Sequence, residues 1–266
     1  MPQSIDKTAF IADGARLAPD VEIGPYCRVG PNATLGDGVK LLSHVVVDGH
    51  THIGPGTEVH PFTVLGGPPQ HLRYQGEPTR LSIGADCVIR EQVSIHRATA
   101  HGGGETIIGD RVYVMSQVHI AHDCKIGNDV VFAGNCTLGG HVEIGQNAII
   151  GGVSAIHQFC RIGERAMVGG GAAVPMDVIP YGSAIGNHAR LAGLNIVGMK
   201  RAGLSRDAIG TLRAAFDELF GPGDVPFRAR IDPVAARYPD SEEVTKMLDF
   251  LRTDANRPIL PLRVKS

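Results

Sequence analysis

The sequence of 266 residues contains no tryptophan, and aromatic residues make up only 5% of it. Aromatic side chains dominate the wide cores of most globular domains, so their scarcity favours a narrow core of aliphatic side chains. Apolar residues still account for 43% of the chain, which is enough to bury such a core. Glycine is abundant, with 35 residues, as expected of a chain that turns many tight corners.

Strong net charge and long apolar runs are also missing. The net charge of −2 gives no basic surface for non-specific nucleic-acid binding, so we expect no nucleic-acid partner. The chain has no stretch of about 20 apolar residues, the length that a membrane-spanning helix needs. It also has no N-terminal segment typical of a secretion signal. We therefore expect a cytoplasmic protein without stable membrane insertion.

Cysteine is scarce, and no pair of cysteines has the spacing of metal ligands. The number is odd, which argues against a disulfide framework, and each cysteine stands four residues after a large apolar residue. We expect all of them to be small, buried apolar side chains of a protein in a reducing compartment. They are Cys27, Cys87, Cys124, Cys136 and Cys160.

A strict period of six residues runs through most of the chain. One position in each six is large and apolar, and the position four residues later is small. A period of six does not match the 3.6 residues per turn of a helix, whereas hexapeptide repeats are typical of a parallel β-helix. Three sixes form one triangular coil, and stacked coils share a continuous core. The longest array has its large residues at Ile108, Val114, Ile120, Ile126, Phe132, Leu138, Ile144, Ile150, Ile156, Ile162, Val168 and Val174.

Two interruptions precede this array. Residues 66–80 contain the adjacent Pro68 and Pro69, which cannot both take part in a β ladder, so we expect a loop that leaves the coil. Residues 98–105 contain the run Gly102–Gly104 but no phosphate-binding motif, which favours a flexible loop over a nucleotide site. Loops on a rigid scaffold often carry function, so both interruptions are candidates for functional segments.

The period becomes helical near residue 191. The sequence predicts a short helix over 194–201, a helix over 206–220 with Ser205 as its N-cap, and a helix from Ser241 to about Leu251. Such a segment can close the open end of a solenoid. We predict two domains: a mainly β domain of hexapeptide repeats over residues 1–190 and an α-helical domain over residues 191–266.

Histidine clusters in the segment 119–124. The repeat directs Ile120 and Cys124 inward, which leaves His122 and Asp123 on the outer wall. A histidine with a nearly neutral pKa is a natural general base, and an adjacent aspartate can fix its tautomer. A row of solvated histidines on the wall is the alternative that the residues alone leave open.

The coil length of 18 residues places further groups on the same wall. Gly140 follows His122 by one coil, His141 follows Asp123 by one coil, and Gln158 follows Gly140 by another. A glycine N–H beside a base can face a developing oxyanion. These residues outline a candidate site for general-base chemistry.

Several motifs beyond the repeat resemble those of the bacterial UDP-N-acetylglucosamine O-acyltransferases, which begin lipid A synthesis. The hexapeptide repeat alone is shared by many acyltransferases, whereas this set is specific, and the similarity spans nearly the whole chain. The motifs occupy residues 5–7, 76–80, 95–97, 101–104, 119–124, 157–160 and 186–188, followed by the helical tail.

The resemblance implies a left-handed parallel β-helix and a homotrimer with active sites between subunits. It implies transfer of a (3R)-3-hydroxyacyl group from acyl carrier protein to the 3-hydroxyl of UDP-N-acetylglucosamine, without a metal or other cofactor. By this resemblance His122 is the general base, Asp123 orients it, the Gly140 N–H faces the oxyanion, and Gly170 limits acyl length, its missing side chain favouring a longer chain. The implied substrate-binding residues are His119, His141, Gln158, Arg73, Gly170, Asn195 and Arg201.

The chain departs from the family pattern at a few positions. His71 stands where relatives have Asp, Arg73 stands where they have Lys, and Val197 and Ala202 replace polar residues. Some relatives prefer a 3-amino analogue of the sugar, so an amine acceptor or another sugar acceptor is the alternative activity. Two further alternatives are a non-catalytic scaffold and a zinc carbonic anhydrase of the same fold, with His60, His96 and His101 as ligands.

Overall fold

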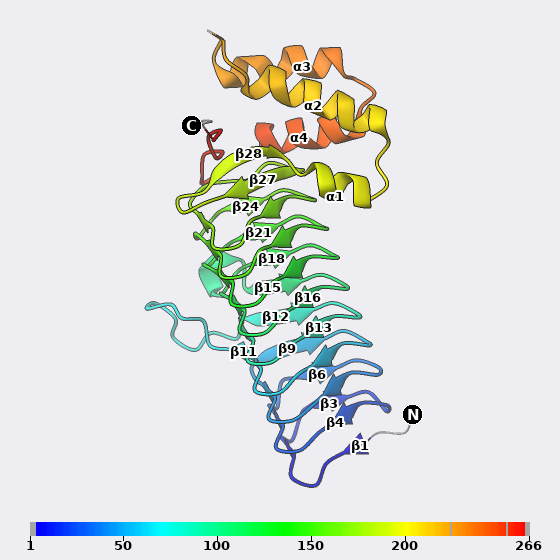
Figure 1. Cartoon of the computed structure of the whole chain (residues 1–266). Helices are drawn as coiled ribbons and strands as arrows, with labels where there is room; N and C mark the ends of the chain where they lie inside the picture. The colour runs from blue at the N-terminus through cyan, green and yellow to red at the C-terminus, as the bar shows by residue number, and fades with distance from the viewer. Residues whose placement is uncertain (1–3, 224, 254, 264–266) are drawn as a thin grey trace.

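The computed structural model describes residues 4–223, 225–253 and 255–263. Most strands are only two residues long, and they stack into three parallel sheets that form the faces of a tall triangular prism (Figure 1). The chain is a left-handed parallel β-helix with a helical cap, as the sequence and the resemblance led us to expect. We call the sheets A, B and C in the order in which each coil visits them, and we name each corner after the two sheets that it joins.

Each sheet takes one strand from each coil. Sheet A contains β1 (Ser4–Ile5), β4 (Glu22–Ile23), β7 (Lys40–Leu41), β10 (Glu58–Val59), β13 (Val88–Ile89), β16 (Tyr113–Val114), β19 (Val131–Phe132), β22 (Ile149–Ile150), β25 (Met167–Val168), β27 (Gly182–Ile185) and β28 (Arg190–Leu194). Sheet B contains β2 (Phe10–Ile11), β5 (Arg28–Val29), β8 (Val46–Val47), β11 (Val64–Gly67), β14 (Ser94–His96), β17 (His119–Ile120), β20 (Thr137–Leu138), β23 (Ala155–Ile156) and β26 (Ala173–Val174). Sheet C contains β3 (Arg16–Leu17), β6 (Thr34–Leu35), β9 (His50–Ile53), β12 (Arg80–Ile83), β15 (Glu105–Ile108), β18 (Lys125–Ile126), β21 (Glu143–Ile144) and β24 (Arg161–Ile162).

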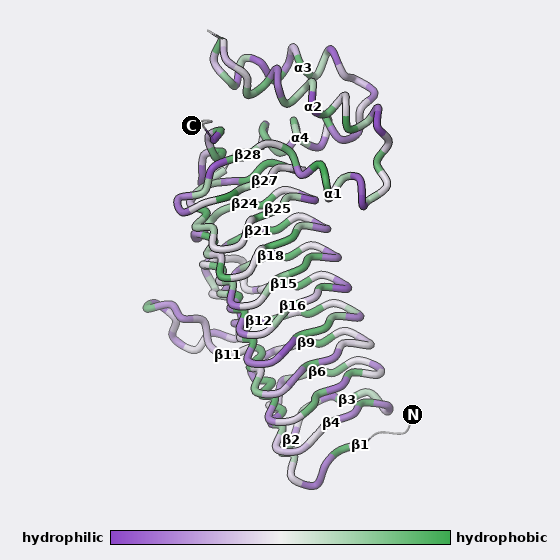
Figure 2. Tube along the Cα trace, in the orientation of Figure 1, coloured by the Kyte–Doolittle hydropathy of each residue, from purple (hydrophilic) through white to green (hydrophobic). Residues whose placement is uncertain are grey.

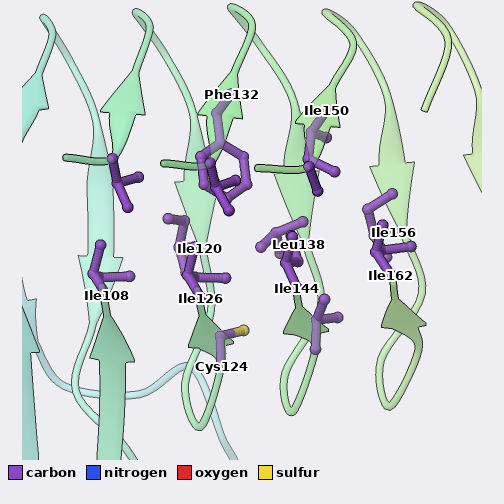
Figure 3. Close-up of a cluster of buried hydrophobic side chains, with 14 of the residues drawn as sticks. Ile108, Ile120, Cys124, Ile126, Phe132, Leu138, Ile144, Ile150, Ile156 and Ile162 are labelled. Atoms are coloured by element: carbon purple, nitrogen blue, oxygen red, sulfur yellow. The ribbon is translucent and has the colours of Figure 1, made fainter. Parts of the chain in front are cut away.

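The large residue of each six points into the prism, as the period predicts. Ile120 and Leu138 from sheet B and Phe132 from sheet A are fully buried in the interior (Figure 3). Apolar and polar segments follow one another along the coils (Figure 2), and successive strand residues face opposite sides of a sheet. The five cysteines are all buried, as predicted, and burial raises the pKa of Cys124 and Cys136 to about 12.

The corners turn through left-handed backbone even where the residue is not glycine. Asp123, His141 and Phe159 follow one another up the B–C corner with φ values of 62°, 60° and 64°. This conformation is unfavourable for side-chain-bearing residues in isolation. It persists here because hydrogen bonds between coils hold it, such as the 3.0 Å bond from the His141 N–H to the His122 carbonyl.

Both interruptions project from the prism near its middle (Figure 1). Residues 68–79 run outside the stack between β11 and β12, as predicted. The second interruption is more ordered than the flexible loop that we expected. It contains a 3₁₀ turn, η1 (Ala100–Gly102), whose N-cap Thr99 accepts a hydrogen bond from the Gly102 N–H.

The repeat ends in an antiparallel pair, β27 and β28, rather than passing directly into a helix. The predicted onset of helix near residue 191 is therefore wrong by a few residues. The hexapeptide pattern did not predict β28, in which Gly193 has a φ of 122°. Strand β28 also crosses the boundary predicted at residue 190, so the division into two domains stays a prediction.

Within the described residues the cap contains four helices, α1 (Ile196–Arg201), α2 (Arg206–Phe220), α3 (Ile231–Arg237) and α4 (Glu242–Arg252), with η2 (Phe227–Arg230) before α3. The predicted helices correspond to α1, α2 and α4, and both predicted N-caps, Ser205 and Ser241, are confirmed. Helix α3 was missed because it is short and contains Pro233, which a helix tolerates within its first turn. None of the helices in the described ranges is long and apolar enough to span a membrane.

Candidate active site

The candidate site lies at the B–C corner, in the coil that follows the second interruption. His122 and Asp123 occupy the turn between β17 and β18, and the chain reverses through the left-handed conformation of Asp123. His122 is 8% exposed and Asp123 is 3% exposed. This burial does not fit the alternative that the sequence left open, a row of solvated histidines on the outer wall.

The two side chains form a short hydrogen bond of 2.7 Å between His122 Nδ1 and Asp123 Oδ2. Burial alone raises the pKa of Asp123, but hydrogen bonds from His122 and Thr99 together bring that pKa below its ordinary value. The carboxylate is therefore ionised at neutral pH and acts only as an acceptor. His122 must then carry its proton on Nδ1, which leaves a lone pair on Nε2.

The second interruption holds the Asp123 carboxylate. The Thr99 hydroxyl donates to Oδ2 at 2.8 Å, and the Thr99 N–H lies 3.0 Å from Oδ1 and 3.2 Å from Oδ2. The Asp123 N–H donates to Thr106 Oγ1 at 2.8 Å. Neither threonine could be predicted from the sequence, because a buried threonine in a loop has no distinctive pattern.

The next two coils place His141 and Phe159 above Asp123. The His141 ring stacks on Phe159 at 4.5 Å and meets the His122 ring edge-on at 5.3 Å. His141 Nε2 lies 3.6 Å from Asp123 Oδ2, which is too far for a strong hydrogen bond. Burial lowers the pKa of His141, so this ring is neutral at neutral pH.

Gly140 lies directly against the His122 ring. A Cβ at this position would lie 2.6 Å from His122 Cε1, so glycine is the residue that lets the ring occupy its place. The Phe159 N–H bonds to the Gly140 carbonyl at 3.0 Å. Within the described residues, no acceptor bonds the Gly140 N–H.

His119 lies one strand before the dyad, beside a second buried histidine. Its Nδ1 is 2.7 Å from the Ser94 hydroxyl, and its ring meets His96 edge-on at 5.0 Å. Burial lowers the pKa of His119, and burial with the nearby His119 and His122 lowers the pKa of His96 to about 4. His96 Nδ1 has no hydrogen-bond partner among the described residues.

The first interruption, residues 68–79, contacts the dyad of His122 and Asp123 through His71. The His71 ring meets the His122 ring edge-on at 5.3 Å, and its Nδ1 accepts from the Arg73 N–H at 3.3 Å. Arg97 attaches the loop to the prism through the Tyr74 hydroxyl at 3.1 Å. In the sequence His71 stands out only as a departure from the family pattern, and no repeat places it beside His122.

The remaining predicted residues lie on different parts of the prism. Gln158 shares the B–C corner, and its carbonyl accepts a hydrogen bond from Arg257 at 3.1 Å. Asn195 caps α1 and donates to the Arg165 carbonyl at 3.0 Å, which places it at the C–A corner. Arg201 ends the same helix, and Gly170 lies at the A–B corner between β25 and β26. One chain therefore does not bring these three residues to His122.

The dyad has the geometry of a possible metal site. In the part of the chain that the structure describes, the one group of three potential ligands within 4.8 Å of one another is His122, Asp123 and His141. His60, His96 and His101, the ligands of the zinc alternative, do not form such a group among the described residues, and His60 instead pairs with Glu58 at 2.8 Å.

A β-helix of hexapeptide repeats with a buried histidine–aspartate pair at one corner defines a hexapeptide-repeat acyltransferase. A family model described as bacterial transferase hexapeptide (six repeats) matches residues 105–140. A second model, described as UDP N-acetylglucosamine O-acyltransferase, domain 2, matches residues 177–260.

Curated relatives and solved structures agree with these models. The chain is 54% identical over 261 residues to the acyl-[acyl-carrier-protein]–UDP-N-acetylglucosamine O-acyltransferase of Caulobacter vibrioides, which covers 98% of this chain and 99% of the relative. It is 46% identical to the enzyme of that name from Rhizobium johnstonii, over 96% of this chain and 93% of the relative. The structure of LpxA from Acinetobacter baumannii superposes with a TM-score of 0.93 at 42% identity, covering 96% and 99% of the two chains. The chain therefore belongs to the acyl-[acyl-carrier-protein]–UDP-N-acetylglucosamine O-acyltransferase family.

Proposed function

We propose that this chain transfers a (3R)-3-hydroxyacyl group from acyl carrier protein to the 3-hydroxyl of UDP-N-acetylglucosamine, the first step of lipid A biosynthesis. Family membership supports the two substrates, because the relatives are named for acyl carrier protein and for this nucleotide sugar. The lack of any disulfide among its buried cysteines fits a cytoplasmic site of action.

One observation carries the assignment of the base: the 2.7 Å bond from His122 Nδ1 to the ionised Asp123. It leaves the Nε2 lone pair to take a proton, and no described residue bonds Nε2. Asp123 also stabilises the imidazolium that forms when His122 accepts that proton. General-base catalysis of this kind contributes roughly 10²–10⁴-fold to a rate.

The reaction then proceeds by direct attack on the thioester. His122 Nε2 takes the proton of the sugar 3-hydroxyl while its oxygen bonds to the thioester carbon. The carbonyl oxygen becomes an oxyanion, and the unbonded Gly140 N–H beside the ring is the donor that we assign to it. The C–S bond then breaks, and the departing thiolate takes the proton from His122. No covalent acyl-enzyme and no metal is needed.

The substrate-binding residues form two groups. His119, His141 and Gln158 share the corner of His122, and we assign them to the sugar, the diphosphate or the acyl hydroxyl. Arg73 lies in the loop that carries His71, and its guanidinium can bind phosphate. Asn195 and Arg201 in α1 are assigned to the nucleotide, and Gly170 to the end of the acyl chain.

We propose that a homotrimer brings the second group to the first. Asn195 and Gly170 lie at the two corners that border sheet A, away from the corner of His122. If sheet A of one subunit faces the B–C corner of the next, both residues reach the neighbour's base, and a three-fold axis repeats the contact.

The outer face of sheet A supports this arrangement. In five successive coils its outward residue is apolar, and each residue pairs with the next across neighbouring strands. All five are partly exposed in the single chain, so a neighbouring subunit or a bound acyl chain can cover them. They are Val88, Tyr113, Val131, Ile149 and Met167.

Acyl transfer from 3-hydroxyacyl carrier protein to UDP-N-acetylglucosamine tests the proposal, with wild type measured beside His122→Ala. His52→Ala is the matched control, because His52 lies on the exposed face of β9. We expect the His122→Ala rate to fall by at least about 10²-fold with the trimer intact by light scattering, while the control keeps its activity. Transfer that survives His122→Ala would move the base to another residue, with His141 next.

The alternative acceptor is tested in the same assay. Equal concentrations of UDP-N-acetylglucosamine and its 3-amino analogue compete for one acyl donor, and the products are separated as ester and amide. We expect the ester to dominate. A strong preference for the amine would replace the hydroxyl acceptor and leave the role of His122 unchanged.

A further inference from the structure

The 3₁₀ turn of the second interruption, η1, contacts the dyad of His122 and Asp123. The next coil, with His141, lies on the other side of the dyad. The N-cap residue of η1, Thr99, is 3% exposed and makes three hydrogen-bond contacts to the Asp123 carboxylate. We propose that Thr99 is a positioning residue for acyl transfer, whose hydroxyl and N–H fix the Asp123 carboxylate so that Oδ2 meets His122 Nδ1. Thr99 acts through Asp123 and touches no reacting atom.

The hydrogen-bond network fixes the direction of the Thr99 hydroxyl. The hydroxyl oxygen accepts from the Gly102 N–H at 3.1 Å, and its single hydrogen is then available to Asp123 Oδ2 at 2.8 Å. The Gly104 N–H closes the turn on the Thr99 carbonyl at 3.1 Å. Hydrogen bonds therefore hold both the hydroxyl and the backbone carbonyl of Thr99, and the hydroxyl donates only toward Asp123.

The glycines of this interruption have a role that the sequence did not reveal. A Cβ at Gly102 would lie 2.2 Å from Asp123 Oδ1, so the turn packs its backbone directly on the carboxylate. Gly103 and Gly104 follow with φ values of 105° and 81°, which let the chain leave the turn at once. The first glycine of the run thus packs on a carboxylate of the protein itself, and the other two let the chain turn away from it.

The charge of Asp123 explains why the contact matters for catalysis. A buried carboxylate needs donors on both oxygens, and Thr99 supplies a donor to each of them. Without the hydroxyl, Oδ2 would keep His122 as its principal donor, and the carboxylate could rotate about its Cβ–Cγ bond. A loose carboxylate would no longer hold His122 in one tautomer, and the fraction of rings with a free Nε2 would fall.

Thr99→Val removes the hydroxyl and keeps the shape, whereas Thr99→Ser keeps the hydroxyl and removes a methyl group. The matched control is Thr57→Val, because the Thr57 hydroxyl, like that of Thr99, accepts a backbone N–H, but it donates to a backbone carbonyl on another part of the prism. We expect Thr99→Val to lower kcat about 10–100-fold at an unchanged KM. Thr99→Ser and Thr57→Val should keep kcat within about two-fold.

A further readout separates positioning from a structural role. Nitrogen-15 spectra of His122, recorded without substrate, should show one tautomer with Nδ1 protonated in wild type and a mixture in Thr99→Val. These spectra do not depend on the acyl-transfer proposal, although the kinetic prediction rests on it.

The outcomes are distinguishable. A folded Thr99→Val enzyme with wild-type kcat and one His122 tautomer would overturn the positioning role. Equal losses in Thr99→Ser and Thr99→Val would overturn it too, since the methyl group would then matter and not the hydroxyl. Wild type without activity but with the expected tautomer change would contradict the proposed function only. If Thr99→Val fails to fold, Gly102→Ala tests the same contact, because its Cβ displaces the carboxylate and leaves Thr99 in place.

Discussion

Two aspartates at neighbouring corners of the same coil have nearly the same backbone and opposite surroundings. Asp123 at the B–C corner and Asp129 at the C–A corner have φ values of 62° and 58°. The Asp123 side chain is completely buried and bonds a histidine and a threonine. The Asp129 side chain is 38% exposed and pairs with the exposed Arg111 at 2.8 Å.

The interruptions make the difference. The Asp129 N–H bonds to the Asp110 carbonyl of the coil below, at 2.9 Å, as the regular repeat dictates. The Asp123 N–H bonds instead to the Thr106 hydroxyl, because the second interruption displaces the coil below it. A repeated corner becomes a candidate active site where inserted segments cover it, and an identical corner without them stays a solvated surface.

The largest expected effect breaks this comparison at its centre. Asp123→Asn keeps the shape of the side chain but removes the charge that fixes the His122 tautomer, so kcat should fall about 10³–10⁴-fold. Asp129→Asn makes the same chemical change at the other corner and should leave kcat within about two-fold. Steady-state acyl transfer on both variants, with the oligomeric state measured in parallel, checks the pair. Similar losses in both would mean that charge on the prism matters and the dyad does not.

A smaller loss is expected from Gly140→Ala. The added Cβ would lie 2.6 Å from His122 Cε1 and must push the ring from its place against the backbone. A displacement of about 1 Å at a catalytic group can cost roughly 10²-fold, and we expect a loss of that order in kcat. Gly210→Ala in α2 is the control, since its Cβ would meet nothing within 4 Å. If Gly140→Ala retains full activity, the ring does not need its position beside this glycine.

The sequence predicted the fold well because the repeat is local. Each large residue of the six has the same inward position in every coil, so Ile120 and Leu138 could be assigned without any knowledge of neighbours. The β27–β28 pair and α3 could not be predicted in this way. Their register depends on contacts with the end of the prism, where a period has no further coil to continue.

The sequence predicted the core of the site for the same reason. The coil length places His141 and Gly140 above Asp123 and His122, and hydrogen bonds between these coils confirm the stacking. The contributions of Thr99 and His71 come from the interruptions, where no period exists and only tertiary packing decides which side chain turns inward. The catalytic and binding roles themselves stay predictions.

Acidic pH should destabilise the covered B–C corner through His96. Its pKa is lowered from 6.5 to about 4, so between these values the unfolded chain binds a proton that the folded chain does not. Stability should therefore fall as pH drops below about 6.5, by about 2 kcal/mol per chain at pH 5. His96→Gln should lose this part of the pH dependence in urea unfolding at one fixed protein concentration, whereas His52→Gln should keep it. An identical pH slope in wild type and His96→Gln would place the titrating group elsewhere.

The smallest effect is expected at the solvated corner. The Arg111–Asp129 pair has two contacts of 2.8 Å, yet both side chains are well exposed, and water screens their attraction. Arg111→Ala should therefore change Tm by less than about 2 °C and leave kcat at the wild-type value. The pair lowers the pKa of Asp129, chiefly through the hydrogen bond from Arg111, so any stabilisation is present above the ordinary carboxyl pKa and is lost as the pH falls through the lowered value. A thermal melt of Arg111→Ala at neutral pH checks the size. A decrease in Tm as large as that expected for a buried pair would show that the exposed C–A corner also needs its ion pair to hold the left-handed turn. The two corners would then differ in the chemistry of their side chains and not in how strongly they depend on them.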